Sequence, residues 1–167
     1  MRLVKLLEDG RRQVLEFLLP GDHIGFDLLS EHEFSAEAVS DTTLKCYSRR
    51  RVEALAEQNQ GVARWLRAQT ARDLRCAQTR IVSLGRKSAT ERIAGFLMEM
   101  SERTRGAGDV LNLPMARTDI ADHLGLTVET VCRTLGRLKQ TNMIAVTGAK
   151  ISISNRHQLE AVGRELH

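Results

Sequence analysis

Between residues 117 and 139, apolar positions recur at helical spacing in two short stretches that Gly125 separates. These positions are, in chain order, Ile120, Ala121, Leu124, Val131, Leu135 and Leu138. Glycine readily adopts the left-handed backbone in which many helices end. Thr127 is placed to cap a second helix, because its hydroxyl can accept a hydrogen bond from an unpaired backbone N–H. The pattern therefore predicts two short helices joined by a tight turn.

The second predicted helix carries small and polar residues opposite its apolar stripe. These are Glu129, Cys132, Arg133, Gly136 and Arg137. Glutamate can accept a hydrogen bond from cytosine N4, and arginine can donate two to guanine O6 and N7. Glu129 and Arg133 are also one turn apart, which is the spacing of a simple surface ion pair. The tight turn before them favours DNA reading, since a helix-turn-helix places its second helix in the major groove.

The first 48 residues alternate between short apolar runs and turn residues. Strands are predicted at 3–7, 13–19, 23–26, 34–39 and 42–47. Asp9-Gly10 marks a hairpin between the first two strands, and Pro20-Gly21 marks a second turn. Many short strands indicate an antiparallel roll or barrel. So few residues make a thin core, and we expect this unit to be truncated at its N-terminus or completed by packing on the next helix.

A short helix is predicted at 49–58 and a long one at 60–85. Within the long helix, five positions step by four and three residues, which is a heptad seam. They are Thr70, Leu74, Ala77, Ile81 and Leu84. The helix would be on the order of 40 Å long. We expect a homodimer joined along this seam; the alternative is that the helix packs on the β-roll of its own chain.

The rest of the chain completes the predicted organisation. Ser88 and Glu91 fit a capping box after a break at Gly85. Further elements are predicted as a helix at 89–103, strands at 110–113, 143–146 and 150–154, and a helix from Asn155 to Leu166. A helix-turn-helix followed by a β-hairpin is the winged variety. The predicted fold class is α+β, with a partial antiparallel β-roll at 1–48, a short helix plus a long dimerisation helix at 49–86, and a winged helix-turn-helix at 87–167.

Composition and charge narrow the class of protein. The chain is 42% hydrophobic and 28% charged, with a formal net charge of +4, which modestly favours polyanionic partners. Its first 44 residues have a net charge of −5, and residues 45–92 have one of +8. Apolar runs fall short of the roughly 20 residues that span a bilayer, and the N-terminus lacks a signal-peptide pattern. We expect a cytoplasmic protein without a membrane partner.

The sequence offers no set of residues for metal binding or catalysis. Cys46, Cys76 and Cys132 are far apart, and the five histidines lack ligand spacing. A nucleophile–base–orienter set and a glycine-rich phosphate loop are both missing from the sequence. We therefore expect no metal, no cofactor and no enzymatic activity.

The order of these parts resembles the Crp/Fnr superfamily of dimeric transcription regulators, including its cyclic-nucleotide-binding-like β-roll. The resemblance spans essentially the whole chain and is strongest at LPGDHIGFDLL, GRKSATERIAGFLMEM and DIADHLGLTVETVCRTLGRLK. The second motif and the run Val128-Glu129-Thr130-Val131 look most like the Fnr/FixK branch. Against that family, the chain begins inside the sensory β-roll.

The resemblance implies a role for particular residues in DNA binding. The base-reading residues predicted in this way are Val128, Glu129, Cys132 and Arg133. The backbone-contacting residues are Arg117, Thr127, Thr130 and Arg137. Ala116 stands where the family often has Thr or Ser, so a weaker helix cap is expected there. The implied target is a TTGA-type inverted repeat in double-stranded DNA, with RNA polymerase as a further partner.

The sequence also narrows the signal to which the protein could respond. The stretch that would bind a cyclic phosphate, 25–38, has no Arg or Lys and carries Asp27, Glu31, Glu33 and Glu37, so a cyclic nucleotide lacks its guanidinium partner. Another small-molecule effector remains an alternative. Cys46 lies near one cluster-ligand position of oxygen-sensing members, but the other three ligands are absent from the chain. An iron–sulfur sensor stays open only if the native N-terminus carries more cysteines.

Cys132 suggests a link to redox status. It stands where the family usually has Ser, beside Arg133 on the predicted DNA-facing side. A neighbouring cation and partial exposure favour the thiolate, which is the oxidisable form of cysteine. Oxidation would add bulk, and in the sulfinic acid negative charge, next to the phosphates. The hypothesis is that oxidation weakens DNA binding; the alternative is that Cys132 merely replaces a small Ser.

Overall fold

The N-terminal hairpin forms where Asp9-Gly10 predicts it. The computed structural model describes residues 1–25, 32–104 and 110–164. In it β1 (Arg2–Leu6) pairs antiparallel with β2 (Arg12–Phe17), and Gly10 takes a φ of 81° in the connecting turn. β3 (Ser35–Glu37) pairs with the other edge of β1, which gives the strand order β2-β1-β3.

Two further strands predicted for this sheet are not seen. Residues 42–47 are irregular and exposed, with Leu44 54% and Tyr47 69% accessible. A strand needs a neighbour for its backbone N–H and C=O groups, and no described segment pairs with this one. Residues 23–25 are also irregular, and Phe26 lies outside the described residues. The prediction at 34–39 is confirmed only for the three residues of β3.

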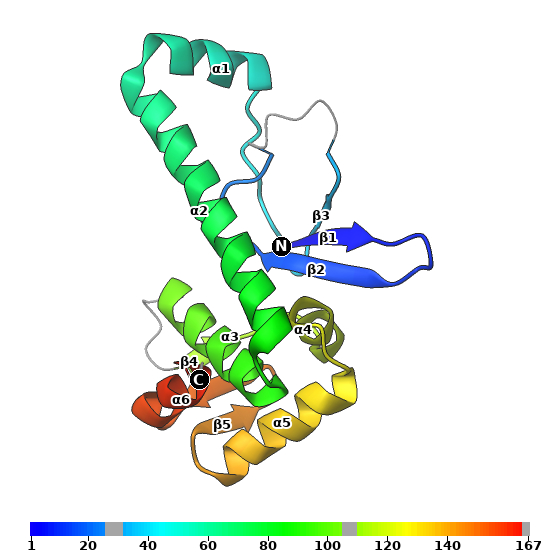
Figure 1. Ribbon diagram of the computed structural model, residues 1–167. Helices are drawn as coiled ribbons and strands as arrows, with labels where there is room; N and C mark the ends of the chain where they lie inside the picture. The colour runs from blue at the N-terminus through cyan, green and yellow to red at the C-terminus, as the bar shows by residue number, and fades with distance from the viewer. Residues whose placement is uncertain (26–31, 105–109, 165–167) are drawn as a thin grey trace.

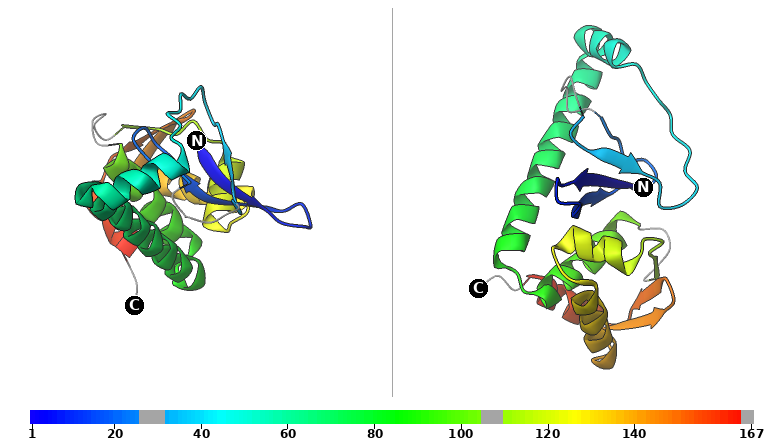
Figure 2. Two further views of the ribbon diagram at one scale, coloured as in Figure 1. Left: turned by 90° about the horizontal axis from the view of Figure 1, so that it is seen from above. Right: turned by 90° about the vertical axis from the view of Figure 1, so that its right-hand side faces the viewer.

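Two consecutive helices follow, as predicted. α1 (Arg49–Gln58) and α2 (Gln60–Arg86) meet at Asn59, whose side chain accepts hydrogen bonds from the Gly61 and Val62 N–H groups at 2.8 and 3.2 Å. Figures 1 and 2 show α2 as a rod that runs from α1, at one end of the molecule, to the C-terminal helices. Neither helix has a buried residue, and all residues of both are described.

The C-terminal module is a winged helix-turn-helix. In chain order its elements are α3 (Ala89–Arg103), β4 (Val110–Asn112), α4 (Arg117–Leu124), α5 (Val128–Gln140), β5 (Ile144–Thr147), β6 (Lys150–Ile153) and α6 (Arg156–Arg164). The Ser88–Glu91 capping box starts α3 as predicted. The three strands form an antiparallel sheet in the order β4-β6-β5. Residues 105–109 and the end of the predicted last helix lie outside the described residues.

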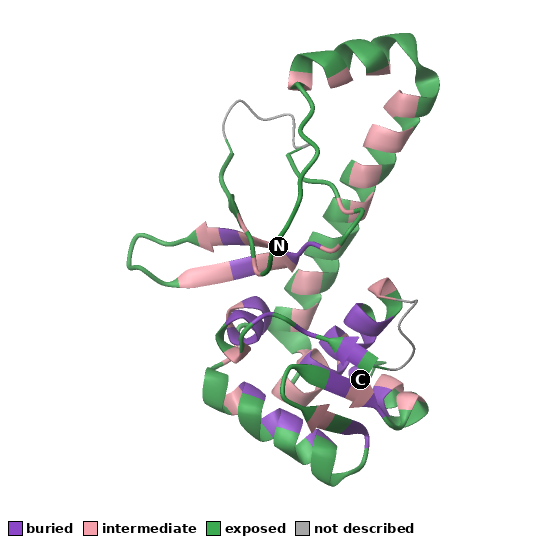
Figure 3. Ribbon diagram, turned by 180° about the vertical axis from the view of Figure 1, so that it is seen from behind, coloured by how far each residue is buried: buried purple, intermediate pink, exposed green. Residues whose placement is uncertain are grey.

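The hydrophobic core extends from this module into the N-terminal hairpin. Val4, Val14 and Phe17 of the hairpin join one cluster with the buried residues of α3, α4 and α5. The Phe17 ring lies 5.9 Å from that of Phe96 on α3, centroid to centroid. The thin hairpin therefore buries its apolar face mainly on the C-terminal module; packing on the next helix was one of the two expectations for this unit, beside truncation at its N-terminus. In Figure 3 most of the buried residues, coloured purple, lie in the C-terminal module, in the lower half of the view.

None of the helices in the described part of the chain is long and apolar enough to cross a membrane.

Candidate nucleic-acid interface

The turn between α4 and α5 is built on Gly125. Its backbone adopts φ 62° and ψ 43°, the left-handed conformation that glycine tolerates best. A Cβ at this position would lie 2.9 Å from Cδ2 of Leu84, at the end of α2. α5 then begins after Thr127, whose hydroxyl accepts a hydrogen bond from the Thr130 N–H at 3.1 Å. The predicted helix-turn-helix is confirmed, and its turn packs directly against α2.

α5 has one buried and one exposed face. The buried residues are Val131, Thr134, Leu135 and Leu138. On the opposite face the side chains of Glu129 and Arg133 are 85% and 70% exposed, with a carboxylate–guanidinium separation of 3.8 Å. An ion pair this exposed contributes little to stability. Both groups are therefore available to partners other than each other.

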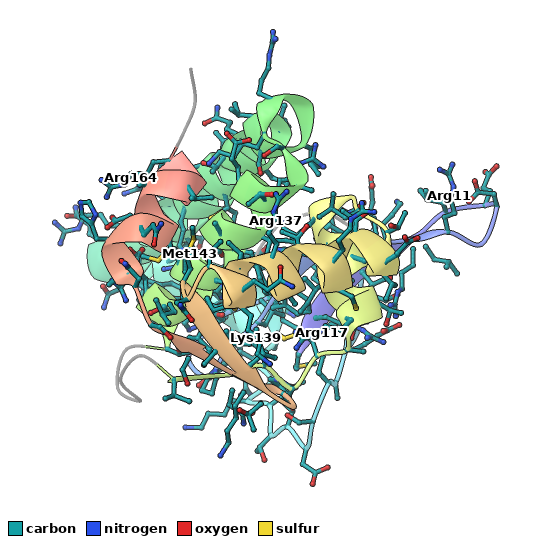
Figure 4. The ribbon with its side chains drawn as sticks, turned by 90° about the horizontal axis from the view of Figure 1, so that it is seen from below. Arg11, Arg117, Arg137, Lys139, Met143 and Arg164 are labelled. Atoms are coloured by element: carbon teal, nitrogen blue, oxygen red, sulfur yellow. The ribbon has the colours of Figure 1, made fainter. Side chains whose placement is uncertain are left out.

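The four predicted base-reading residues lie together on the exposed side of α5. Val128 is 39% exposed at the first position of the helix, and Cys132 is an exposed free thiol one turn later. With Glu129 and Arg133 they form a surface that combines one apolar side chain, one thiol, one carboxylate and one guanidinium. Figure 4 looks onto this side of the molecule, with α5 lying across the view.

The predicted backbone-contacting residues already have partners within the chain. Arg117 donates to the Gly148 carbonyl at 3.4 Å and so connects α4 to the β5–β6 turn, the wing. The hydroxyls of Thr127 and Thr130 lie 2.9 Å apart at the start of α5. Arg137 donates to the Thr90 hydroxyl at the start of α3. Three of these four residues thus stabilise the helix starts of the module, and Arg117 supports its wing.

Two exposed lysines near this surface were not predicted from the sequence. Lys139 is in the last turn of α5, and Lys150 begins β6 beside the wing turn. In Figure 4 Lys139 and Arg117 lie on the same side of α5. For Lys150, the sequence signal that could have predicted this place was a basic residue close to the turn at Gly148.

The heptad positions of α2 are all exposed in the single chain. Leu74 is 59% accessible, Ile81 71% and Leu84 36%, and Thr70 and Ala77 are exposed as well. Packing of this seam on the chain's own β-roll is therefore not seen among the described residues. The seam presents a line of apolar side chains to solvent along the rod.

The acidic stretch at 25–38 is only partly described, since Asp27 and Glu31 lie outside the described residues. Glu33 pairs with Lys5 at 3.2 Å and Glu37 with Arg2 at 2.7 Å. The three cysteines are free and exposed. The described residues contain no group of three His, Cys, Asp or Glu side chains that could hold a metal ion.

Two polar residues of α4 are buried, which the sequence did not predict. Asp119 is 3% and His123 2% accessible. Burial first, and then the nearby Arg80 guanidinium, lower the pKa of His123 to about 3. The His123 Nδ1 lies 3.1 Å from the Val14 carbonyl, which can only accept. The imidazole is therefore neutral, with its proton on Nδ1.

Two family models match the chain. A Crp-like helix-turn-helix domain matches residues 91–162, and a cyclic nucleotide-binding domain matches residues 1–59. The first covers the winged helix-turn-helix, including the whole of α5. The second covers the hairpin sheet and α1.

Relatives with high identity are regulators. The nitrogen fixation regulation protein FixK of Bradyrhizobium diazoefficiens is 41% identical over 165 residues, which are 97% of this chain and 70% of that protein. FixK of Rhizobium meliloti is 45% identical over 150 residues, 90% of this chain and 67% of that protein. The structure of FixK2 from Bradyrhizobium japonicum superposes with a TM-score of 0.94 at 42% identity, over 99% of this chain and 84% of that one.

Proposed function

Because the chain belongs to the Crp/Fnr family of transcription regulators, with FixK proteins among its relatives, we propose that it is a homodimer that reads a TTGA-type inverted repeat through α5. The observation that carries this proposal is the exposed face of α5. Its Glu129 and Arg133 side chains point into solvent while the opposite stripe anchors the helix in the core. The relatives are transcription regulators, and the chain is not an enzyme.

Each base-reading residue has a distinct chemical task in this proposal. Arg133 donates two hydrogen bonds, to guanine O6 and N7. Glu129 accepts a hydrogen bond from cytosine N4 of the same or the neighbouring base pair. Val128 meets a thymine methyl group at the start of the helix, and Cys132 lies against the groove between them. The exposure of these four residues supports the assignment.

The backbone contacts follow from the groups around α5. Arg117 binds a phosphate beside the wing, with Lys139 and Lys150 as additional cations. Thr127 and Thr130 lie at the positive end of the α5 dipole, which suits an anionic oxygen. Arg137 reaches a phosphate after releasing Thr90. These contacts are independent of sequence and make binding salt-dependent.

The dimer places two such surfaces on one duplex. Thr70, Leu74, Ala77, Ile81 and Leu84 pair with the same residues of a second copy, and the exposure of this seam supports the pairing. A two-fold dimer matches the symmetry of an inverted repeat. From that position the bound protein acts on RNA polymerase, and oxidation of Cys132 provides the link to redox status.

The test is DNA binding by the full chain, measured by fluorescence anisotropy at one fixed salt concentration. Arg133→Ala should cost about 1–3 kcal/mol on a TTGA inverted repeat and relax the preference at one base pair per half-site. Arg117→Ala should instead weaken all duplexes alike, because a phosphate contact carries no sequence information.

A matched control is Arg164→Ala. Arg164 pairs with Glu160 on α6 and lies across the molecule from Arg117 in Figure 4. Its loss should leave both affinity and base preference unchanged. An unaltered preference in Arg133→Ala would contradict the role assigned to Arg133, and no preference for TTGA in the wild type would contradict the target.

A further inference from the structure

The β1–β2 hairpin is tied to the helix-turn-helix by ion pairs. Arg12 of β2 donates from Nε and Nη2 to Asp122 of α4 at 3.0 and 2.7 Å, and from Nη2 to Asp119 at 2.7 Å. Arg2 of β1 also donates to Asp119. The hydrogen bonds to Asp122 raise the pKa of Arg12 above its ordinary value. Two guanidinium groups of the sensory sheet thus meet two carboxylates of the DNA-binding module.

Asp119 serves the hairpin and α4 at the same time. Its Oδ2 accepts a hydrogen bond from the Ala116 N–H at 3.1 Å, while its Oδ1 accepts from Arg2 and Arg12. The carboxylate therefore caps the start of α4, where the Ala116 side chain cannot. A buried carboxylate is stable only when its oxygens are satisfied in this way. The same group that begins the first helix of the helix-turn-helix fixes that helix to the sensory sheet.

Further contacts extend the connection to the other end of α4 and to α2. Gln13 donates to the Asp122 carbonyl at 2.5 Å, and His123 donates from Nδ1 to the Val14 carbonyl. Arg80 of α2 lies 2.5 Å from His123 Nε2 and 3.2 Å from its carbonyl oxygen. The hairpin, α4 and α2 consequently form one connected unit.

This connection matters because the covalent link between α2 and the DNA-binding module is short. Only Lys87 and Ser88 separate α2 from α3, and two residues alone do not fix an orientation. In a dimer joined along α2, the angle between each module and α2 sets the distance between the two α5 helices. α4 packs on α5 across the Gly125 turn. Contacts that fix the orientation of α4 therefore also fix the orientation of α5.

From these contacts we infer that Arg12, together with Arg2, Asp119 and Asp122, is a positioning site that sets which separation of half-sites the dimer accepts. The inference rests on the proposed function, since it presumes two recognition helices on one duplex. One added base pair rotates a half-site by about 35° around the duplex axis and moves it by about 3.4 Å. A rigid dimer rejects that change, and a loosened one tolerates it.

The experiment compares inverted repeats whose half-sites are separated by the optimal number of base pairs, by one fewer and by one more. Wild type should bind the optimal repeat about tenfold or more tightly than either altered repeat. Arg12→Ala should reduce this ratio to about twofold, mainly by weaker binding to the optimal repeat, because each module is then free to turn. Base preference within a half-site should stay that of the wild type, since no residue of α5 is changed.

Arg11→Ala is the matched control. Arg11 is the neighbouring residue of the same hairpin, and its Nε donates to Asp9 of its own turn at 2.7 Å. It lies at the hairpin tip, at the edge of the molecule in Figure 4. It should keep the wild-type spacing ratio. The exchanged pair Arg12→Asp with Asp122→Arg should recover much of the ratio that Arg12→Asp alone loses. A merely structural role would instead lower affinity for all three repeats equally.

The outcomes separate this inference from the proposed function. If the wild type shows no preference for the inverted repeat over unrelated DNA, the proposed function fails. If the wild type shows that preference and Arg12→Ala keeps the wild-type spacing ratio, only the positioning role is overturned. Circular dichroism and an unfolding curve for each variant ensure that folded proteins are compared.

Discussion

At the residue scale, the exposed face of α5 places the proposed base-reading residues beside an exposed thiol. Cys132 is an exposed free thiol on the same face as Glu129 and Arg133. Its sulfur can be oxidised in place, since neither the core nor another described side chain shields the residue. A sulfinate there would carry negative charge to the phosphates, at the surface where the proposed dimer meets DNA. In the proposed complex, an oxidised Cys132 would therefore carry its charge to the point where charge affects binding most.

We predict that peroxide weakens DNA binding by the wild type and leaves Cys132→Ser unaffected. The hydroxyl of Ser has nearly the size of the thiol but does not oxidise. The measurement is the Kd for the inverted repeat before and after peroxide, and again after a thiol reductant. The reductant converts sulfenic acid or a disulfide back to the thiol, but it does not reduce sulfinic acid.

Cys46→Ser and Cys76→Ser are the controls, because both thiols are also exposed. These variants should remain as sensitive to peroxide as the wild type. Equal sensitivity of wild type and Cys132→Ser would remove Cys132 from the redox response.

The residue scale also shows which parts of the site the sequence could predict. The apolar spacing of α5 predicts its buried stripe, and so also which residues face outward. Asp119 and His123 carry no such signal, because their partners Arg12 and Val14 are more than 100 residues away in the chain. Local pattern places them on a short helix and cannot say that a distant hairpin covers them.

At the scale of elements, the predictions that rest on local sequence signals are confirmed, and those that need a distant partner are not. The hairpin at Asp9-Gly10, the long helix and the winged module carry their signals locally, in turn chemistry and apolar period, and all three are confirmed. The strand predicted at 42–47 has the right composition but no neighbour in the described chain. α2 shows the same dependence on distant partners, because its Arg80 contacts His123 of α4, 43 residues further along the chain.

The burial of His123 at this junction predicts a pH dependence of stability. Its folded-state pKa of about 3 lies below the value of 6.5 for an exposed histidine, so unfolding takes up a proton between these two values. Stability that is complete above about pH 6.5 therefore declines as the pH falls toward 3. At pH 5 the loss from this group is about 2 kcal/mol.

Urea unfolding of the wild type and of His123→Gln at about pH 7.5 and about pH 5 measures this effect. Glutamine stays neutral, so the variant should lose less stability on acidification, even if it is less stable at both values. The difference between the two proteins in stability lost on acidification cancels the effect of groups that both contain. Glu16 is one such group: burial raises its pKa, so its contribution to stability falls as the pH rises. Arg80 and Arg103, the charged groups that lower the pKa of His123, are present in both. Parallel losses in the two proteins would contradict a buried neutral histidine.

At the scale of the whole molecule, two surfaces face in different directions. The seam of α2 runs along the rod, and α5 crosses the lower end of the molecule (Figure 2). The hairpin network and the Leu84 contact at Gly125 connect these two surfaces within one chain. A second copy joined along the seam would hold two α5 helices at one separation, which is the geometry that an inverted repeat requires.

We predict that Ile81→Glu converts the protein to a monomer and lowers its affinity for the inverted repeat by about 100-fold. Ile81 is 71% exposed in the single chain, so the charge should not disturb the fold of one copy. In the dimer the same change would place two like charges against each other in an apolar seam. Without the partner each half-site binds alone, and the gain from binding both halves together is lost.

Val82→Glu provides the comparison, because Val82 is the next residue, is 45% exposed and lies outside the heptad seam. It should remain a dimer with wild-type affinity. Sedimentation equilibrium gives the mass, and anisotropy on a whole repeat and on a single half-site gives the affinities. The two variants should bind the single half-site equally, since α5 is intact in both. A dimeric Ile81→Glu protein with full affinity would mean that the copies meet through some other surface, and the two α5 helices would then no longer be placed by α2.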